Sequence, residues 1–143
     1  MRSFVLDASV AAKWFLPYEE ESLQREAVLL LQGHARGEVR FAVPDLFWAE
    51  LGNVFWKATR QARFTESEAQ ISLAGLRSWN LPTVPSETLL GLALKLAHAY
   101  GRSVYDCLYV ALAIDTKTEL ITADEKLANA VAAHLPVKWL GAI

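Results

Sequence analysis

Four acidic residues occupy places in this chain where an acid is unfavourable unless a cation accompanies it. Asp7 and Asp124 each follow a short apolar run, so each lies just beyond the end of a segment typical of a buried strand. Open α/β sheets bind their ligands at such strand ends. Glu50 lies on an apolar stripe with the spacing of one helix face, and Asp106 lies at the start of another apolar helix. Because an unpaired charge on a buried helix face is unfavourable, something must compensate Glu50 in particular.

Helix capping is the plain alternative for three of these acids. Asp7 or Ser9 can cap the first helix, and Asp106 stands three residues after Ser103, as in a capping box. Asp124 suits the first turn of the last helix, where an acid interacts favourably with the helix dipole. The fourth acid lies in mid-helix, where no cap is needed, and its alternative is a buried ion pair with a lysine or arginine.

Taken together, the four acids favour a metal site. If the strands before Asp7 and Asp124 are parallel neighbours, both carboxylates meet at one edge of the sheet, beside the helix start that bears Asp106. Carboxylates that lie close together raise each other's pKa or recruit a cation. Hard oxygen ligands select Mg²⁺ or Mn²⁺, and no histidine or cysteine cluster favours zinc. Such a site suits phosphodiester hydrolysis, because the cations orient an attacking water, lower its pKa and neutralise charge on the phosphate.

Composition predicts one compact domain over residues 1–143. The chain is 53% hydrophobic and 21% charged, a balance that lets it bury most of its apolar surface and disfavours disorder. The single cysteine, Cys107, cannot form an internal disulfide, which suits a reducing compartment. No stretch approaches the ~18 uninterrupted apolar residues of a membrane span. These features favour a cytoplasmic protein with no membrane partner.

A net charge of −2 gives no positive field over the whole protein, so any polyanion must be held locally. The candidate cations are Lys57, Arg60 and Arg63 near the end of one helix, and Lys13, Arg36, Arg40, Arg77 and Arg102 elsewhere. Most surface cations have no special role, so ordinary solvated charge is the alternative for each of them.

Apolar runs of strand length alternate with longer helical patterns, which predicts βα units and a mainly parallel sheet. The expected strands are residues 3–6, 40–43, 82–84, 119–122 and 137–140. The expected helices are residues 9–16, 19–34, 44–61, a fourth that begins at a capping box formed by Thr65 and Glu68, 87–100, 103–116 and 124–134. The fold class is therefore α/β.

Four segments, in chain order, carry the four acids. They are FVLDASVAAKWF (residues 4–15), PDLFWAELGNV (44–54), SVYDCLYVALA (103–113) and LITADEKL (120–127). These segments resemble the motifs of PIN-domain ribonucleases, and in particular the VapC toxins of bacterial and archaeal toxin–antitoxin pairs. Four ordered motifs that span nearly the whole chain are far more specific than any one of them.

The resemblance implies a PIN-like three-layer sandwich, in which a central, mainly parallel five-stranded sheet is flanked by about seven helices. It also implies an endoribonuclease in which the acids converge on one or two Mg²⁺ or Mn²⁺ ions. The family's acidic positions are matched one by one by Asp7, Glu50, Asp106 and Asp124. Ser9 and Thr122 match hydroxyl positions beside the metal, where they could orient a carboxylate or a metal-bound water. Asn53, one helical turn after the second acid, either hydrogen-bonds into the cluster or is a surface amide.

Aromatic residues surround much of the helix that bears Glu50. Because Phe47, Trp48, Phe55 and Trp56 lie on different sides of it, some of them should remain uncovered by the core of the domain. The resemblance implies a homodimer and a VapB-like antitoxin segment as what covers them, with RNA as the substrate.

Other classes of protein compete with the nuclease. A haloacid-dehalogenase-like phosphatase needs a second Asp two residues after the first, where this chain has Ser9. A receiver domain would leave Glu50 on its helix without a role. A non-catalytic PIN-like domain that binds only RNA or a partner is the remaining alternative, and the intact acids argue against it. Asp45, which follows Pro44, is interpreted as a helix cap outside the site.

Overall fold

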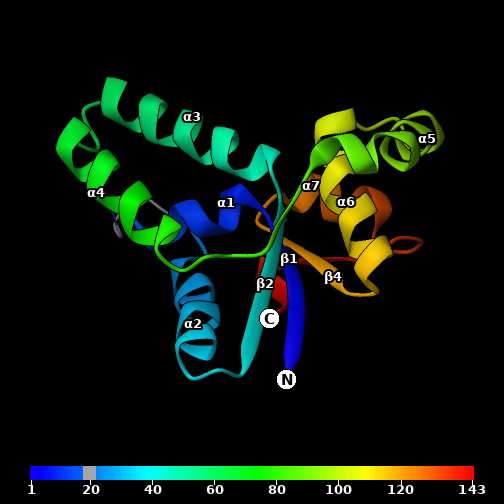
Figure 1. The fold of residues 1–143 in the computed structure, drawn as a ribbon, viewed down its shortest axis with the longest axis horizontal. Helices are drawn as coiled ribbons and strands as arrows, with labels where there is room; N and C mark the ends of the chain where they lie inside the picture. Colours follow the sequence, from blue (N-terminus) through cyan, green and yellow to red (C-terminus); the bar gives the residue numbers. More distant parts are fainter. Residues whose placement is uncertain (18–21) are drawn as a thin grey trace.

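A five-stranded sheet forms the centre of the computed structural model, which describes residues 1–17 and 22–143 (Figure 1). Its strands are β1 (Arg2–Leu6), β2 (Val39–Pro44), β3 (Thr83–Val84), β4 (Glu119–Thr122) and β5 (Val137–Trp139). Their spatial order is β3-β2-β1-β4-β5, and every pairing between them is parallel. Each expected strand is present, with its ends shifted by no more than one residue.

The order of the strands reverses at β1. From β1 the chain builds β2 and β3 on one side, and it later returns to place β4 and β5 on the other side. Leu6 of β1 lies opposite Ile121 of β4, so the two strands end side by side. Both residues are fully buried, as expected for strands covered on both faces. This reversal creates a crevice at the carboxyl ends of β1 and β4, where α/β sheets bind ligands.

The α-helices of the described residues are α1 (Ala8–Ala11), α2 (Gln24–Ala35), α3 (Leu46–Arg60), α4 (Glu66–Arg77), α5 (Leu90–Tyr100), α6 (Val104–Thr116) and α7 (Glu125–Val131). Short 3-10 helices are η1 (Ala12–Trp14), η3 (Ser86–Leu89) and η4 (Leu140–Ala142). No helix in the described ranges is both long enough and apolar enough to cross a bilayer.

Several expected helices differ from the observed ones at their ends. The first divides into α1 and η1, and the last ends at Val131 rather than near 134. The second begins at Gln24, directly after Leu23 with a φ of 58°. Residues 19–21 of that expected helix lie outside the described residues. The capping box of α4 is confirmed, since the Thr65 hydroxyl accepts from the Glu68 amide at 3.0 Å and the Glu68 carboxylate accepts from the Thr65 amide at 3.2 Å.

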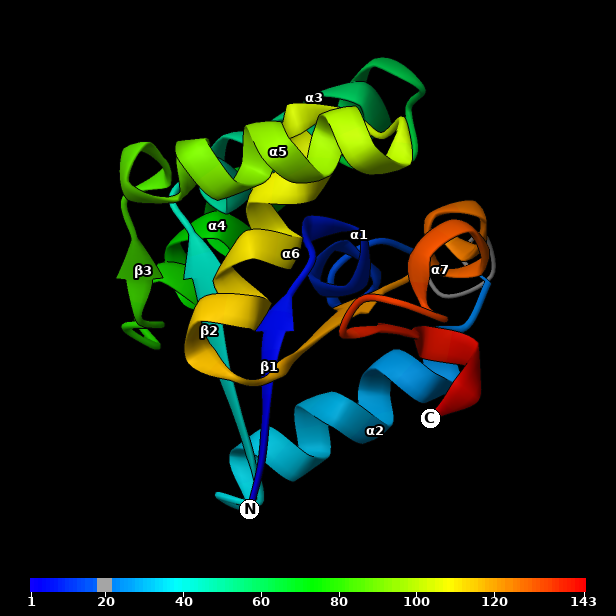
Figure 2. The ribbon, with the colours of Figure 1, turned by 90° about the vertical axis from the view of Figure 1, so that its right-hand side faces the viewer.

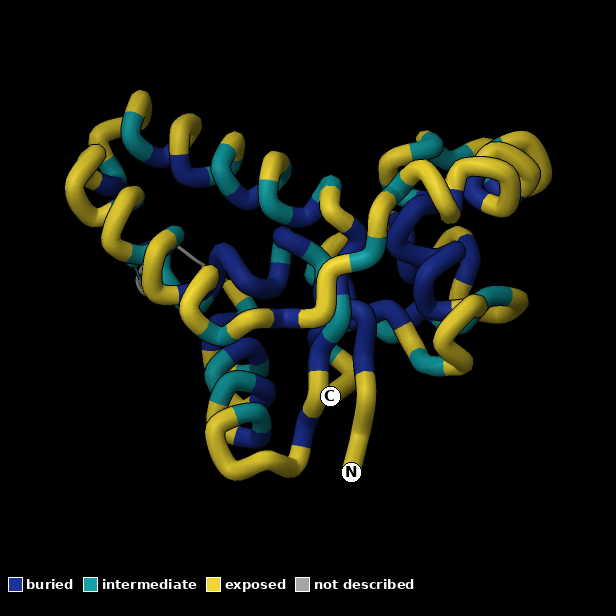
Figure 3. The backbone as a smooth tube through the Cα atoms, viewed as in Figure 1, coloured by how far each residue is buried: buried dark blue, intermediate teal, exposed yellow. Residues whose placement is uncertain are grey.

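Helices cover both faces of the sheet and so form three layers. Helix α6 packs against β1, β2 and β4, and α5 packs on α6 (Figures 1 and 2). Helices α1, α2, α3 and α4 lie on the other side of β1 and β2 in Figure 1. Strands β1, β2 and β4 and helices α1 and α6 are largely buried, whereas α4 and α5 are mostly exposed (Figure 3). The fold class and its mainly parallel sheet are thus confirmed.

Helix α3 is amphipathic because its buried residues recur every three or four positions. Phe47, Leu51 and Phe55 face the core. Trp48 is half-buried, and Trp56 remains 53% exposed, which confirms that the core leaves part of the aromatic set uncovered.

Asp45 stands at the N-cap position of α3 without capping it through its side chain. Instead its carboxylate accepts hydrogen bonds from the Ser86 amide, at 3.0 Å, and from the Ser86 hydroxyl. These bonds to Ser86 lower the pKa of Asp45 below its ordinary value. The side chain therefore joins the start of α3 to η3, which corrects the capping interpretation.

Candidate active site

The carboxylate of Asp7 is held at the point where β1 ends and α1 begins. Its Oδ2 accepts hydrogen bonds from the Thr122 hydroxyl at 2.6 Å and from the Ser9 hydroxyl at 3.0 Å. Its backbone amide donates to the Ile121 carbonyl at 3.2 Å, which continues the pairing of β1 with β4. Strands β1 and β4 are therefore parallel neighbours, as the predicted metal site requires.

Backbone amides fix both hydroxyls in turn. Ser9 Oγ accepts from the Ala123 amide at 3.1 Å, and Thr122 Oγ1 accepts from the Asp124 amide at 3.1 Å. Each hydroxyl thus receives one hydrogen bond from the loop after β4 and donates its own proton to Asp7. The arrangement fixes the orientation of the Asp7 carboxylate.

The pKa of Asp7 lies above its ordinary value chiefly because the carboxyl group is buried. Donation from Thr122 and Ser9 opposes the rise, and the negative charge of Asp106 adds to it. The ionised form of Asp7 is therefore destabilised in the folded chain, and a bound cation would stabilise it.

Glu50 lies at the edge of the buried face of α3 rather than within it, because its side chain is half-buried. Its partner is a tyrosine and not the lysine or arginine of the ion-pair alternative: the Tyr109 hydroxyl of α6 donates to Glu50 Oε1 at 2.5 Å. Partial burial raises the pKa of Glu50, the Tyr109 bond opposes the rise, and the charges of Asp7 and Asp106 add to it.

Asp106 and Asp124 lie on either side of Arg102. The Arg102 Nη2 atom is 3.6 Å from Asp106 Oδ2 and 4.0 Å from Asp124 Oδ2. Burial raises the pKa of Asp106, Arg102 lowers it, and the charge of Asp124 raises it further. The Arg102 Nε atom is buried and has no hydrogen-bond partner among the described residues.

A residue can cap a helix and still belong to the acidic site. Asp124 caps α7, since its Oδ1 accepts from the Leu127 amide at 3.0 Å, while its Oδ2 faces Arg102. The Ser103 hydroxyl caps α6 by accepting from the Asp106 amide at 3.1 Å, which leaves the Asp106 carboxylate available to the site.

All four acids line one cleft of about 500 Å³. Its polar and charged lining residues are Asp7, Ser9, Glu50, Asn53, Lys57, Tyr105, Asp106 and Asp124. Thr122 is fully buried and reaches the cleft only through its bond to Asp7. The cleft thus gathers acids from the end of β1, from α3, from α6 and from the loop after β4.

Comparison with known proteins identifies the family. The PIN domain family matches residues 4–132. This chain belongs to the PIN-domain family. Ribonuclease VapC3 of Pyrobaculum aerophilum is 33% identical to it over 129 residues, which are 87% of this chain and 92% of the relative. The resemblance to VapC proteins is thereby confirmed.

Solved structures agree with the PIN-like fold. A crystal structure from Pyrobaculum aerophilum superimposes with a TM-score of 0.67 at 20% identity, over 99% of this chain and 91% of that one. A toxin–antitoxin complex from Klebsiella pneumoniae gives a TM-score of 0.60 at 17% identity, over 94% and 95% of the two chains. VapBC2 of Rickettsia felis, bound to a DNA fragment from its promoter, gives a TM-score of 0.62 at 14% identity, over 96% of this chain and 98% of that one. These likenesses show the fold.

The acids of this PIN domain fit a divalent cation in donor type and in charge. Carboxylate oxygens are the ligands that Mg²⁺ and Mn²⁺ prefer, and burial, with a further contribution from mutual repulsion, raises the pKa of three of the acids. Within the described residues, no three acidic, histidine or cysteine side chains are gathered closely enough to hold an ion as they stand. The side chains of Asp106 and Asp124 are 36% and 44% exposed, which leaves room for their Oδ2 atoms to turn from Arg102 toward a shared ion.

Sequence reasoning missed two partners of the acids. Arg102 is predicted from the sequence only as a candidate cation for a polyanion, with ordinary surface charge as its alternative, and Tyr109 is given no role. Arg102 lies four residues before Asp106 and Tyr109 lies three residues after it, which is the spacing of neighbours on one helix face. That spacing was available in the sequence, but the contact of Tyr109 with Glu50 depends on how α6 packs beside α3.

Proposed function

We propose that this PIN domain is a Mg²⁺- or Mn²⁺-dependent endoribonuclease and the toxin of a toxin–antitoxin pair. The observation that carries the proposal is the cleft at the β1–β4 reversal, where acids from four parts of the chain meet and three have a raised pKa. The relative that is 33% identical is named a ribonuclease, which supports nuclease chemistry. The structural likeness to toxin–antitoxin complexes supports the toxin role.

In this proposal Asp7, Glu50, Asp106 and Asp124 hold the metal. A bound divalent cation would supply an acidified water and would neutralise charge on the phosphate. The residues of the chain position its ligands: Ser9 and Thr122 orient Asp7 through their hydroxyl groups.

Tyr109 orients Glu50, and its own protonation state suits this role. Burial raises the pKa of Tyr109 well above its ordinary value, and the negative charges of Asp7 and Glu50 raise it further. The hydroxyl therefore stays protonated at neutral pH and donates to Glu50. Arg102 offsets part of the charge of Asp106 and Asp124.

Cleavage of a labelled single-stranded RNA tests the enzyme. The chain should cut it with Mg²⁺ or Mn²⁺, and a chelator or the substitution Asp7→Asn should abolish cutting. An intact fold with RNA binding but no cutting in either metal would instead support the non-catalytic alternative.

We propose a VapB-like antitoxin and a second copy of this chain as protein partners. Apolar side chains remain exposed on α3, α5 and α6, among them Trp56, Leu94 and Tyr105. An antitoxin would block the acidic cleft with a basic side chain that takes the place of the cation. Expression in the host cytoplasm should be harmful alone and tolerated with the antitoxin, and light scattering should show a dimer.

A further inference from the structure

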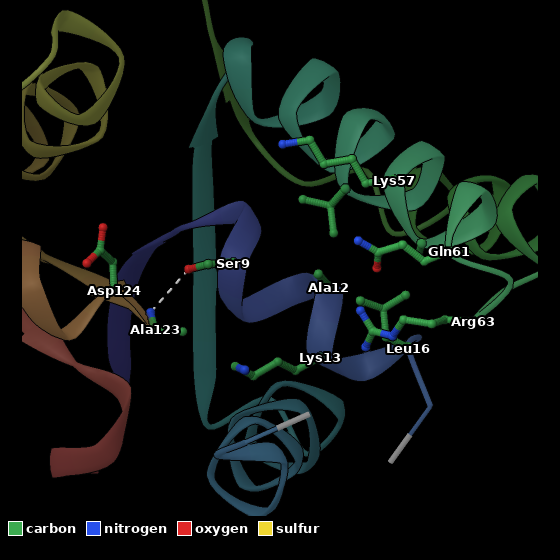
Figure 4. Close-up of a pocket in the computed structure, with 11 residues that line it drawn as sticks. Ser9, Ala12, Lys13, Leu16, Lys57, Gln61, Arg63, Ala123 and Asp124 are labelled. Carbon is green, nitrogen blue, oxygen red and sulfur yellow. Dashed lines mark hydrogen bonds between the residues drawn. The ribbon is translucent and has the colours of Figure 1, made fainter. Parts of the chain in front are cut away.

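A second cleft of about 430 Å³ adjoins the acidic one and has the opposite charge. Its cations are Lys13 of η1, Lys57 of α3 and Arg63 of the segment after α3, together with the amide of Gln61. Figure 4 shows these side chains around the space between α3 and the α1–η1 segment. We call it the basic cleft.

The two clefts are continuous. Both are lined by Ser9, Val54, Lys57 and Asp124, so a chain that leaves the acidic cleft past Ser9 enters the basic one. Within residues 1–17 and 22–143, Asp124 at this boundary is the acid that lines the basic cleft, and the other charged lining residues carry positive charge. The charge of the lining residues therefore changes from mainly negative in the acidic cleft to mainly positive in the basic cleft, across the residues that the two clefts share.

The basic cleft also has an apolar floor that strengthens its field. Ala12, Leu16 and Ala58 are buried and line it, and Lys13 is only 7% exposed. Charges beside low-dielectric walls act on an anion more strongly than charges in open water. Among the described residues, no aromatic side chain lines the cleft, so its described lining offers cations and not a stacking surface.

We propose that the basic cleft binds a backbone phosphate of single-stranded RNA that flanks the phosphate being cut. The proposal rests on the nuclease function above and adds the path of the substrate. With a net charge of −2 the molecule has no general attraction for RNA, so a local cationic site must anchor the strand. Lys13 and Arg63 already take part in interactions within the chain, so a bound phosphate would join groups that are already engaged.

A phosphate site of this kind positions RNA without reading its sequence. Ammonium and guanidinium groups bind the backbone of every nucleotide alike, so the basic cleft would set where the strand lies. An acidic protein segment is the competing occupant. Continuity of the two clefts favours RNA, because a strand whose phosphate is cut in the acidic cleft can extend directly into the basic cleft.

Binding of RNA that cannot be cut tests the site apart from catalysis. In an Asp7→Asn background with Mg²⁺, fluorescence anisotropy measures the Kd of a labelled single-stranded RNA at several salt concentrations. Lys57→Gln and Arg63→Gln should each raise the Kd roughly fivefold and lower the slope of log Kd against log salt by about 0.7, the value for one lost phosphate contact. The shifts should be equal for adenine-rich and uracil-rich RNA. Lys95→Gln on exposed α5, which lines neither cleft, is the matched control.

Arg63→Lys separates charge from fold. It should keep the salt slope of the parent, and melting curves should show that each variant is folded. If Lys57→Gln and Arg63→Gln keep the Kd and slope of Lys95→Gln, the basic cleft does not bind RNA. If a polyglutamate peptide, but not RNA, loses affinity in these variants, the occupant is an acidic protein segment and the proposal is wrong.

Failure of the proposed function would show in a different measurement. If the unsubstituted chain cuts no RNA in Mg²⁺ or Mn²⁺, the nuclease assignment fails whatever the binding data show. If it cuts RNA while the salt slopes do not change, only the basic cleft proposal fails.

Discussion

Asp7 at the end of β1 and the acids on the helices are held in different ways. Asp7 receives hydrogen bonds from Ser9 and Thr122, whose own orientations are fixed by backbone amides. Glu50 depends on the Tyr109 hydroxyl, and Asp106 faces a guanidinium at 3.6 Å. Asp7 is fixed by the register of the sheet, whereas the helical acids depend on the packing and rotation of side chains between helices.

This difference suggests a division of labour in metal binding. Asp7 is preset, because moving its carboxylate would break bonds that join α1 to the loop after β4. Asp106 and Asp124 are more exposed, so their Oδ2 atoms can turn toward an ion after it meets Asp7, while Asp124 Oδ1 caps α7. The preset ligand Asp7 and the adjustable ligands Asp106 and Asp124 should therefore respond differently to substitution of their partners.

The largest effect is expected from the ligands themselves. Loss of an outer partner of a metal ligand typically costs about 10–100-fold in activity, so Asp7→Asn and Asp106→Asn should each reduce cleavage by more than ~100-fold. Circular dichroism should show an unchanged fold. Cleavage of RNA in Mg²⁺ at the parent rate by either folded variant would remove that residue from the proposed ligands.

The hydroxyls that orient Asp7 should come next. Thr122→Val and Ser9→Ala remove a donor to Asp7 and also the acceptor of a backbone amide, so cleavage should fall about 10–100-fold. The free energy of unfolding should fall by about 1–3 kcal/mol, because a polar group is left unsatisfied. Urea unfolding and cleavage rates measure both effects.

Thr116→Val is the control for these hydroxyl variants. Thr116 donates to the Leu112 carbonyl at 2.8 Å within α6 and lines neither cleft. If Thr122→Val loses stability but retains full cleavage, the hydroxyl serves the fold alone and the idea of a preset Asp7 is wrong.

A smaller effect is expected from Tyr109→Phe. It removes the donor to Glu50 while keeping the ring in the core, and the half-buried carboxylate can take water in its place. The loss of stability should be about 1 kcal/mol, with a several-fold weaker affinity for Mn²⁺, measured by calorimetry. A loss of cleavage as large as that of Thr122→Val would show that the helical acids are held as firmly as Asp7.

The surroundings of Asp7 could be predicted from the sequence better than those of the acids on the helices. The strand ends that precede Asp7 and Asp124 could be located from apolar runs, whereas the places of Ser9 and Thr122 beside Asp7 followed from the resemblance to the family. The partners of the helical acids could not be found in this way. The contact of Tyr109 with Glu50 requires the relative position of α3 and α6, which no local pattern specifies. The short helices and their ends were least predictable, because α1 changes to a 3-10 turn after one turn of α-helix.

The last prediction concerns stability without metal. The folded-state pKa of Asp7 and of Asp106 lies above the ordinary value of 3.8. Each group therefore contributes stability that is fully present below pH 3.8 and is lost as the pH rises through the raised pKa. An asparagine does not titrate, so Asp7→Asn and Asp106→Asn should unfold at higher urea than the parent at neutral pH in a chelator, and this advantage should vanish below pH 3.8.

Added Mg²⁺ should reverse the order of stability. A cation stabilises the folded chain in proportion to its affinity for the site, so the parent should gain more from it than either variant. Asp124→Asn extends the comparison to an acid that also caps α7. If all three variants melt below the parent without metal at every pH and still gain as much from Mg²⁺, the acids act as structural caps. The difference between preset and adjustable ligands would then have no role in metal binding.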